Sequence, residues 1–518
     1  MDKHTVHPAA IVVFCILFVF VTVVGFAAAR WRKADLGHLN EWGLAGRKFG
    51  TWLTWFLIGG DIYTAYTFIA VPAAMFSTGS AGFFAFAYTT LVFPVLFVFG
   101  PRFWAVCKRH GYITAADFVQ GRFGSSTLAL AVALTGILAT MPYIGLQLVG
   151  LKTVIAAMGI PGDWPIIVAF IVLAAYTYQS GLRAPALTAI AKDIAIYVTV
   201  TVAIIYIPIK LGGFGHIFNA AGSALPKRTP PAALVPGKSA AYETYATLAL
   251  GSAFALFLYP HALTGALSAG SGHAIRRNAT LLTFYSFALG IIAIFGYMAI
   301  AAHLKPANPN FTVPDLFIRY FPSWFEGFAF AAIGVGALVP AAIMAIAAAN
   351  LFTRNIYKQY ARPQADAREE ATVAKLVSVL VKAGALVFAL FVSTKSAIDL
   401  QLLGGVWIIQ TLPAVFLALY TRWFHRWALL AGWAVGMATG TIMAASQSFK
   451  SAFPLSIGSF KVTMYSAFLA ILANLIVTIV LTPITRRLDG REPVDETADD
   501  DYLDVNAESR DEPGLIPA

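Results

Sequence analysis

Long apolar runs separated by short polar segments make up most of this chain. Runs of about 20 apolar residues, the length a helix needs to cross a bilayer, recur along it. The pattern predicts thirteen spans, at 9–29, 50–77, 82–106, 127–156, 164–181, 185–209, 243–269, 279–302, 326–350, 373–393, 399–420, 427–447 and 463–484. We therefore expect an all-α polytopic membrane protein, with one transmembrane domain over residues 1–487.

Two predicted spans carry residues that would interrupt a helix at mid-depth. "FLIGGDIYTAYTFIAVPAA" (56–74) contains a Gly pair, an Asp and a Pro, and "GSAFALFLYPHALTGALSAG" (251–270) contains Tyr-Pro-His. Proline removes a backbone donor, and a broken helix is tolerated in lipid only where it lines a protein cavity. Either kink alone fits a packing bend equally well. Two breaks five spans apart favour an inverted repeat, here about 50–209 and 243–420, with a substrate site between them.

Composition and charge agree with a membrane protein. Hydrophobic residues make up 59% of the chain and charged residues 12%, about half the charged fraction of a soluble protein. The positive-inside rule places the basic connections in the cytoplasm and the N-terminus outside. These connections carry Arg30, Arg32, Lys33, Arg47, Lys48, Arg102, Lys108, Arg109, Arg122, Arg276, Arg277, Arg354, Lys358, Arg362, Arg368, Arg422, Arg426, Arg486 and Arg487. The basic loop 210–242 is an exception, because long loops translocate largely regardless of charge.

The chain ends in an acidic segment. Eleven acidic residues against two arginines lie between positions 489 and 512, although the whole chain has a net charge of +11. Such a composition is typical of disorder. We therefore expect residues 488–518 to form a disordered cytoplasmic tail, and the protein to lie in the plasma membrane, as a bacterial inner-membrane protein.

Motifs of other function classes are missing from the sequence. There is no Gly-rich phosphate loop, H-E-x-x-H motif or nucleophile elbow, so an enzyme is not supported. The two cysteines, Cys15 and Cys107, have no metal-site spacing and are interpreted as structural thiols. We expect no cofactor, no metal site, no nucleic-acid binding and no obligate protein partner. The partners implied are the lipid bilayer, a small solute and a coupling cation.

Five segments spread along the chain share a pattern with one family: "GLAGRKFGTWLTWF", "GYITAADFVQGRFGS", "SGLRAPALTA", "PAAIMAIAAANLFTRNIYKQY" and "LPAVFLALYTRWFHRWALLAGWAVGMATG". They resemble the sodium:solute symporter family, which has the LeuT-like fold with a 5+5 inverted repeat and extra terminal helices. The resemblance implies thirteen spans, an outside N-terminus and cation-coupled uptake of a small solute. Within the family, the chain is most similar to the MctP-type monocarboxylate permease branch.

The chain departs from this family at its conserved sodium site. Family members hold the ion with two backbone carbonyls of the first core helix, which match Gly60 and Tyr63. The hydroxyl pair of the eighth core helix matches Val339 and Pro340, and the fifth-helix Asp matches Ala189. None of these last three supplies a side-chain oxygen, and Na⁺ prefers oxygen ligands. We expect the sodium site to be vestigial.

Ionisable residues inside spans are functional candidates, because they are costly in lipid. Asp61 lies beside the Gly pair, and Lys192 and Asp193 lie about one turn past Ala189. A lysine here resembles proton-coupled transporters of the same fold, so we expect Asp61 or the Lys192–Asp193 pair to carry a proton. A structural ion pair is the alternative. Lys382, in the tenth span, should have a carboxylate partner that the sequence does not name.

The polar residues near the two breaks suit a small carboxylate, because broken helices expose N–H groups. The candidates for substrate binding are Tyr63, Thr64, Tyr66, Thr67, Tyr143, Gln147, Tyr259, His261, Trp407 and Gln410. The resemblance implies lactate, pyruvate or alanine as substrate. Another amino acid, acetate, urea or a vitamin would fit the composition equally well. A channel would need a continuous polar stripe and a sensor an added signalling domain, and the sequence favours neither.

Overall fold

The computed structural model of the chain describes residues 7–30, 35–228, 231–235, 239–391, 397–458, 460–489 and 494–503. The first half contains α1 (Pro8–Ala27), α2 (Leu39–Leu44), α3 (Thr51–Gly60), α4 (Val71–Thr78), α5 (Phe84–Arg109), α6 (Ala115–Phe123), α7 (Ser126–Ala157), α8 (Trp164–Ser180), α9 (Arg183–Lys210) and α10 (Phe214–Ala224). The second half contains α11 (Ser239–Leu256), α12 (Pro260–Leu267), α13 (Gly272–Leu281), α14 (Thr283–Ala293), α15 (Phe295–Ala301), α16 (Thr312–Tyr320), α17 (Ser323–Phe352), α18 (Ala367–Phe391), α19 (Ala397–Ile408), α20 (Leu412–Val415), α21 (Arg426–Ser446) and α22 (Ser466–Asp489).

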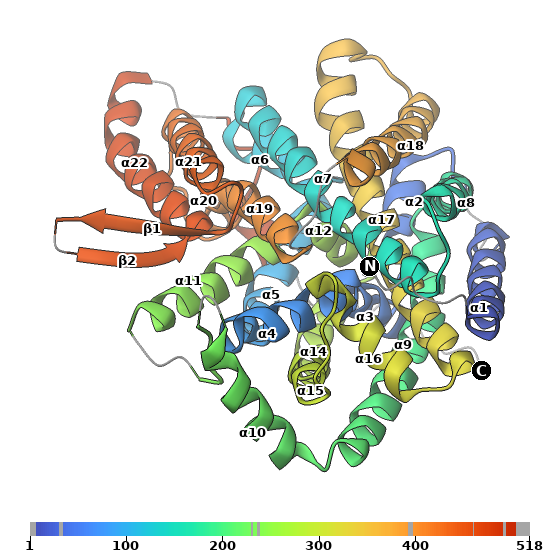
Figure 1. Cartoon of the computed structure of the whole chain (residues 1–518). Coiled ribbons are helices and arrows are strands. Elements are labelled where there is room, and N and C mark those ends of the chain that lie inside the picture. The colour runs from blue at the N-terminus through green and yellow to red at the C-terminus, as the bar shows by residue number, and fades with distance from the viewer. Residues whose placement is uncertain are drawn as a thin grey trace.

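Short elements complete the chain. They include the π-helical turns η3 (Tyr66–Ala70) and η7 (Thr353–Ala361) and the 3-10 turns η8 (Ile409–Thr411), η9 (Leu417–Leu419) and η10 (Asp499–Tyr502). Strands β1 (Ala452–Ile457) and β2 (Phe460–Tyr465) form an antiparallel hairpin in which Ala452 pairs with Tyr465. In Figure 1 this hairpin lies at one edge of the molecule and α1 at the other. The rest of the described chain is almost entirely helical, as the sequence predicts.

Most of the predicted spans correspond to helices that could cross a membrane. Ten helices among the described residues are long and apolar enough to do so, and an eleventh is obtained if α11 and α12 form one broken span. The two other predicted spans correspond to shorter apolar helices, Tyr66–Thr78 and Trp164–Ser180. The helical membrane architecture is thus confirmed, whereas the number of thirteen spans stays a prediction.

Helix α17 lies at the centre of the packing, and the eighteen residues of its most apolar stretch are all buried. It contacts α1, α7, α9, α12 and α18. Small residues let neighbouring backbones come close, as is common between membrane helices. A Cβ atom at Gly327 would lie 2.2 Å from the carbonyl oxygen of Ala10 in α1. This close packing places α7, α9 and α12 around the middle of the molecule, where the interrupted helices meet.

The acidic segment near the C-terminus is more ordered than expected. Residues 494–503 pack against the protein, and the side chains of Asp501 and Tyr502 are buried. Carboxylates of this segment pair with Arg109, Arg122 and Arg422. We call the side of the molecule on which these three arginines lie the arginine-rich face. These ten residues, which the sequence places in a disordered tail, thus have counter-charges elsewhere in the chain that the composition of the segment does not reveal. The remainder of 488–518, beyond Asp489, lies outside the described residues.

Candidate functional site

The first predicted break is present between α3 and η3. Residues 61–64 leave the helical path, which frees backbone groups that need other partners in a buried setting. The Gln147 side chain of α7 accepts a hydrogen bond from the Ala65 N–H through Oε1, over 3.1 Å. The hydroxyl of Thr67 donates to the carbonyl of Ile62. Side chains predicted to contact substrate thus also hold the break open.

The Gly pair has a role different from the expected one. Gly59 and Gly60 form the last turn of α3 rather than the break itself. A Cβ atom at Gly59 would lie 2.5 Å from the ring of Tyr285, and one at Gly60 would lie 2.9 Å from Nζ of Lys192. Both positions therefore need glycine because side chains of α14 and α9 approach the backbone there.

Lys192 of α9 reaches into the break. Its ammonium group donates to the carbonyl of Gly60 and, over 3.1 Å, to the carbonyl of Tyr63. Nζ also lies 3.1 Å from Oδ1 of Asp193, and both side chains are 0% exposed. Buried charges require such partners. The two carbonyls that match the family's sodium ligands are therefore occupied by a covalently attached cation.

Tyr285 of α14 completes this group, and the sequence did not single it out. Its hydroxyl donates to Oδ2 of Asp193 over 2.8 Å. Its ring packs against Trp55 and Tyr63 with centroids 4.7 and 4.6 Å apart, and the hydroxyl of Tyr63 donates to its carbonyl. A single tyrosine in an apolar helix carries no distinctive pattern, so only the fold could reveal it.

Helix α17 offers no side-chain oxygen next to this break. Ala189, Val339 and Pro340, which match the lost sodium ligands, are buried. A Cβ atom at Gly336, one turn before Val339, would lie 3.6 Å from the carbonyl oxygen of Tyr63. The residues of α17 that face this carbonyl are thus apolar. Na⁺ needs several oxygen ligands. The apolar residues of α17 and the ammonium group of Lys192 do not supply them, so this place does not fit Na⁺.

The second break, between α11 and α12, meets the first. The two helices are bent by 50°, and the bend brings His261 to Asp61, with Nε2 and Oδ2 3.3 Å apart. The rings of Tyr143 and Tyr259 flank the imidazole at centroid distances of 5.4 and 5.2 Å. Both helix breaks thus contribute one titratable group to the same buried place.

Several polar atoms around this meeting point have no hydrogen-bond partner among the described residues. They include Oδ1 of Asp61, both ring nitrogens of His261, the hydroxyl of Tyr66 and Nε2 of Gln147. Buried polar groups are normally paired, so unpaired ones gathered around two helix breaks indicate a place where a small polar ligand binds. Acceptors and donors are both present in this group.

Other predicted substrate residues have partners within the protein. Thr64 Oγ1 accepts from the N–H of Tyr66 over 3.0 Å, and the Tyr259 hydroxyl donates to the carbonyl of Gln401 over 3.1 Å. The Tyr63 ring packs on Tyr285, on the lysine side of the break. The side chains of Thr64, Tyr259 and Tyr63 therefore contact other parts of the protein and help to shape the site.

Trp407 and Gln410 do not face the breaks. Trp407 Nε1 donates to Thr441 of α21 over 3.0 Å, and Gln410 Oε1 accepts from Asn474 of α22 over 3.1 Å. The sequence predicts that they close the pocket, whereas α19 and η8 turn the two side chains toward α21 and α22. In an apolar span, sequence alone does not fix that rotation.

Lys382 does not have the expected carboxylate partner among the described residues. It is fully buried in α18, and its Nζ makes no hydrogen bond there. A carboxylate partner is expected because buried amines are usually paired. Lys382 also takes no part in the contacts of the two breaks.

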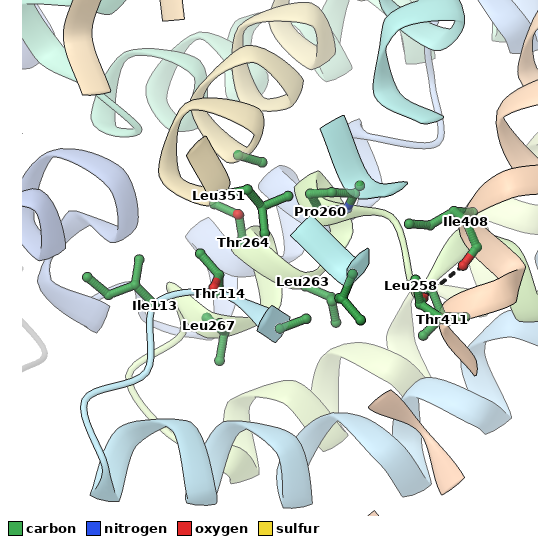
Figure 2. Close-up of a pocket in the computed structure, with 14 residues that line it drawn as sticks. Ile113, Thr114, Leu258, Pro260, Leu263, Thr264, Leu267, Leu351, Ile408 and Thr411 are labelled. Carbon is green, nitrogen blue, oxygen red and sulfur yellow. Dashed lines mark hydrogen bonds between the residues drawn. The ribbon is translucent and has the colours of Figure 1, made fainter. Parts of the chain in front are cut away.

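Cavities lie on both sides of the breaks. A small cavity of about 20 Å³ lies toward the arginine-rich face. Figure 2 shows the residues that line it from α12, from the loop before α6 and from α19 with η8, among them Ile113, Thr114, Pro260, Leu263, Thr264, Leu267, Ile408 and Thr411. A larger cavity of about 310 Å³ lies along α4, and Ser77, Asn310 and Asp399 are among the residues that line it. The space is therefore much wider on the side away from the arginines.

Comparisons with known proteins agree with this architecture. Residues 42–440 match the model of the family described as "Sodium:solute symporter family". The chain belongs to the sodium:solute symporter family. A solved Na⁺-coupled sialic acid symporter, described as substrate-bound and outward-open, superposes with a TM-score of 0.72, covering 92% of this chain and 98% of that one, at 17% identity. The LeuT-like fold is thereby confirmed, and as a family member the protein is a solute symporter embedded in a membrane.

Two curated relatives cover nearly the whole chain. A "Monocarboxylate transport permease protein" of Rhizobium johnstonii is 51% identical over 94% of this chain and 99% of its own length. An "Uncharacterized symporter YodF" of Bacillus subtilis is 32% identical over 94% and 96%. The similarity to a monocarboxylate permease agrees with the branch expected from the sequence.

Replacing Gly59 tests the close packing at the break. Gly59→Ala should lower the free energy of unfolding by roughly 1–3 kcal/mol, because the added methyl group overlaps the Tyr285 ring. Thermal unfolding in detergent and transport activity measure the effect. Gly215→Ala in α10, where an added Cβ meets nothing within 4 Å, is the matched control and should lower neither quantity, since Ala favours a helix over Gly. An equal effect of the two substitutions would contradict the packing argument.

Removing the unpaired amine in α18 should stabilise the protein. Lys382→Met keeps the length of the side chain but removes a buried polar group without a partner, and should raise the free energy of unfolding by roughly 1–3 kcal/mol. Lys152→Met, which removes a half-exposed ion pair with Asp163, should change it by less than about 1 kcal/mol. A loss of stability in Lys382→Met would show that the amine has a stabilising partner.

Proposed function

We propose that this symporter imports a small monocarboxylate such as lactate or pyruvate together with a proton. The observation that carries the proposal is the Lys192 ammonium group on the carbonyls of Gly60 and Tyr63. A fixed cation there removes the need for Na⁺ at the place where the family resemblance expects it. The 51% identity to a protein named as a monocarboxylate permease supports the substrate class.

The position of Asp61 supports proton coupling. Its carboxylate lies where the two breaks meet, beside His261 and with Oδ1 unpaired. An anionic substrate next to an ionised Asp61 would be repelled, since like charges in a buried site destabilise one another. Protonation of Asp61 removes the repulsion and turns the carboxyl group into a donor. Substrate and proton therefore bind together in this proposal, and Asp61 is the proton carrier.

Lys192 and Asp193 have a supporting role in this proposal. Their mutual contact and the hydroxyl of Tyr285 compensate both charges, so the pair can stay ionised while Asp61 gains and loses its proton. An exchange of the proton within the Lys192–Asp193 pair is the second possibility that the sequence raised. The variants described below separate the two.

The unpaired groups favour a substrate with a carboxylate and one further polar group. Nε2 of Gln147 and the hydroxyl of Tyr66 can donate to a carboxylate, whereas a hydroxyl or keto oxygen can contact His261. The helix ends at the two breaks add backbone N–H groups that favour an anion. Alanine fits the same groups, with its ammonium group toward Asp61.

The asymmetry of the cavities favours one direction of access. The wide cavity opens away from the arginines, and the positive-inside rule assigns the arginines to the cytoplasm. In this orientation the protein lies in a bacterial inner membrane and takes up its substrate from outside. Its N-terminus is outside the cell, and the described acidic segment is in the cytoplasm.

Vesicle transport tests the coupling ion. In proteoliposomes loaded at alkaline pH, uptake of labelled lactate should follow an inward proton gradient and should not change when choline replaces Na⁺. The uptake should be abolished by a protonophore. Accumulation driven by a sodium gradient at equal pH on both sides would overturn the proton coupling while leaving the substrate open.

Asp61→Asn tests the proton carrier. The amide imitates a protonated carboxyl group, so exchange of labelled for unlabelled lactate should persist, whereas accumulation against a gradient should fall at least tenfold. Asp193→Asn should instead weaken both activities, because it leaves the buried Lys192 charge with less compensation. If Asp61→Asn accumulates lactate at the normal rate, the proton carrier is the Lys192–Asp193 pair and not Asp61.

The alternative is a sodium- or proton-coupled symporter of another small solute, such as an amino acid, acetate, urea or a vitamin. A transport-deficient host that expresses the protein can be grown on a panel of carbon and nitrogen sources. Growth restored by lactate or pyruvate agrees with the proposal. Growth restored only by an unrelated solute contradicts it.

A further inference from the structure

The acidic segment 494–503 lies across the arginine-rich face and contacts it through several charged groups. Asp495 Oδ2 accepts hydrogen bonds from Arg122 and, over 2.9 Å, from Arg422. Arg422 also donates to Oδ1 of Asp499 over 2.9 Å and to the carbonyl of Thr497 over 3.0 Å. The contact is therefore made by a network of charges rather than by one pair.

The end of the segment is anchored more deeply. Asp501 accepts hydrogen bonds from Arg109 over 2.8 Å, and its other carboxylate oxygen lies 2.7 Å from Nε2 of His110. Tyr502 is 4% exposed, and its hydroxyl lies 2.7 Å from Oγ1 of Thr497. A buried tyrosine and a buried carboxylate at the same end show that this short segment has its own docking place.

This docking place is assembled from parts of the chain that are far apart in sequence. Arg109 and His110 end α5, Arg122 belongs to α6, and Arg422 lies in the loop between η9 and α21. The backbone is involved as well, because the N–H of Glu496 donates to the carbonyl of Gly121 over 2.9 Å. The segment thus ties α5 and α6 to the loop that follows η9.

The tied elements adjoin two walls of the small cavity in Figure 2. Ile113 and Thr114, in the loop between α5 and α6, line it from one side, and Ile408 and Thr411, just before α20 and η9, line it from another. Widening this cavity toward the arginine-rich face requires the two walls to separate. Separation would stretch or break the contacts of the acidic segment.

We propose that residues 494–503 act as an electrostatic clasp that holds the transport path closed on the arginine-rich face. The clasp is an autoinhibitory contact: it stabilises the state with the narrow inner cavity and must release when the path opens there. Its partner is a part of the same chain, and it does not depend on which solute or ion is transported.

Ionic strength is a variable that should loosen this clasp, because charged groups make most of its contacts. Burial raises the pKa of Asp501, but hydrogen bonds from Arg109, His110 and the N–H of Ala498 outweigh this effect and hold the pKa at about 2. The stabilisation is therefore present above the unfolded pKa, near 4, and is lost only as the pH falls through about 2. Arg109 and Arg422 are nearly half exposed, so salt screens their attraction.

Cysteine labelling in the full-length protein tests the clasp directly. In a chain in which Cys15 and Cys107 are replaced by Ser and Ala, Ile113→Cys places a thiol on the cavity wall. The double variant Asp495→Asn/Asp501→Asn should raise its rate of labelling by N-ethylmaleimide roughly 5- to 10-fold, the lower end of the typical coupling between sites. Asp500→Asn is the matched control, because this exposed neighbour takes part in none of the ion pairs described above, and should leave the rate unchanged.

Salt provides a second measurement that needs no change in the acidic segment. Raising KCl from 0.1 to 1 M should speed labelling of Ile113→Cys when the acidic segment is intact. The same change should have little effect on the double variant, whose clasp is already open. Equal labelling in all variants at both salt concentrations would overturn the proposal. Because the readout is thiol accessibility, this outcome is independent of the proposed substrate and coupling ion.

Discussion

The contact between the Lys192 ammonium group and the carbonyls of Gly60 and Tyr63 is the constraint on which the site depends. A helix that breaks inside a bilayer leaves carbonyl groups without partners, and each costs several kcal/mol if it stays unpaired. The lysine supplies the partner, and its own charge is compensated by Asp193. Gly60 must then remain glycine, because the ammonium group occupies the space of its side chain.

The two breaks differ in how completely their polar groups are paired. On the lysine side, the ammonium group lies 3.1 Å from Oδ1 of Asp193, and Oδ2 of Asp193 accepts a hydrogen bond from Tyr285. On the side of Asp61 and His261, several donors and acceptors remain unpaired. A protein that must bind and release a small solute needs this division, because a fully paired site would have no hydrogen-bonding capacity left for its ligand.

Much of this arrangement could be predicted from the residues. Apolar length predicts the spans, Pro and Gly predict the breaks, and matching the family motifs places Lys192 near the vacated ion ligands. The differences between expectation and structure share one physical cause. Trp407, Gln410 and Lys382 lie in apolar helices where hydrophobic periodicity is weak, so the sequence does not tell which neighbour each side chain meets. Tyr285 and the docking of Asp501 depend on contacts between distant segments, which composition alone does not encode.

The cation at this break is a side chain of the protein, and this has an energetic consequence for transport. Lys192 cannot cross the membrane with the solute, whereas a bound Na⁺ does. Under the proposed coupling, one monocarboxylate and one proton cross together and carry no net charge, so the membrane potential does no work on the cycle. The highest accumulation would then be set by the pH difference alone, about tenfold for each pH unit. Such a transporter would be electroneutral, and would suit a cell that meets its substrate in acidic surroundings.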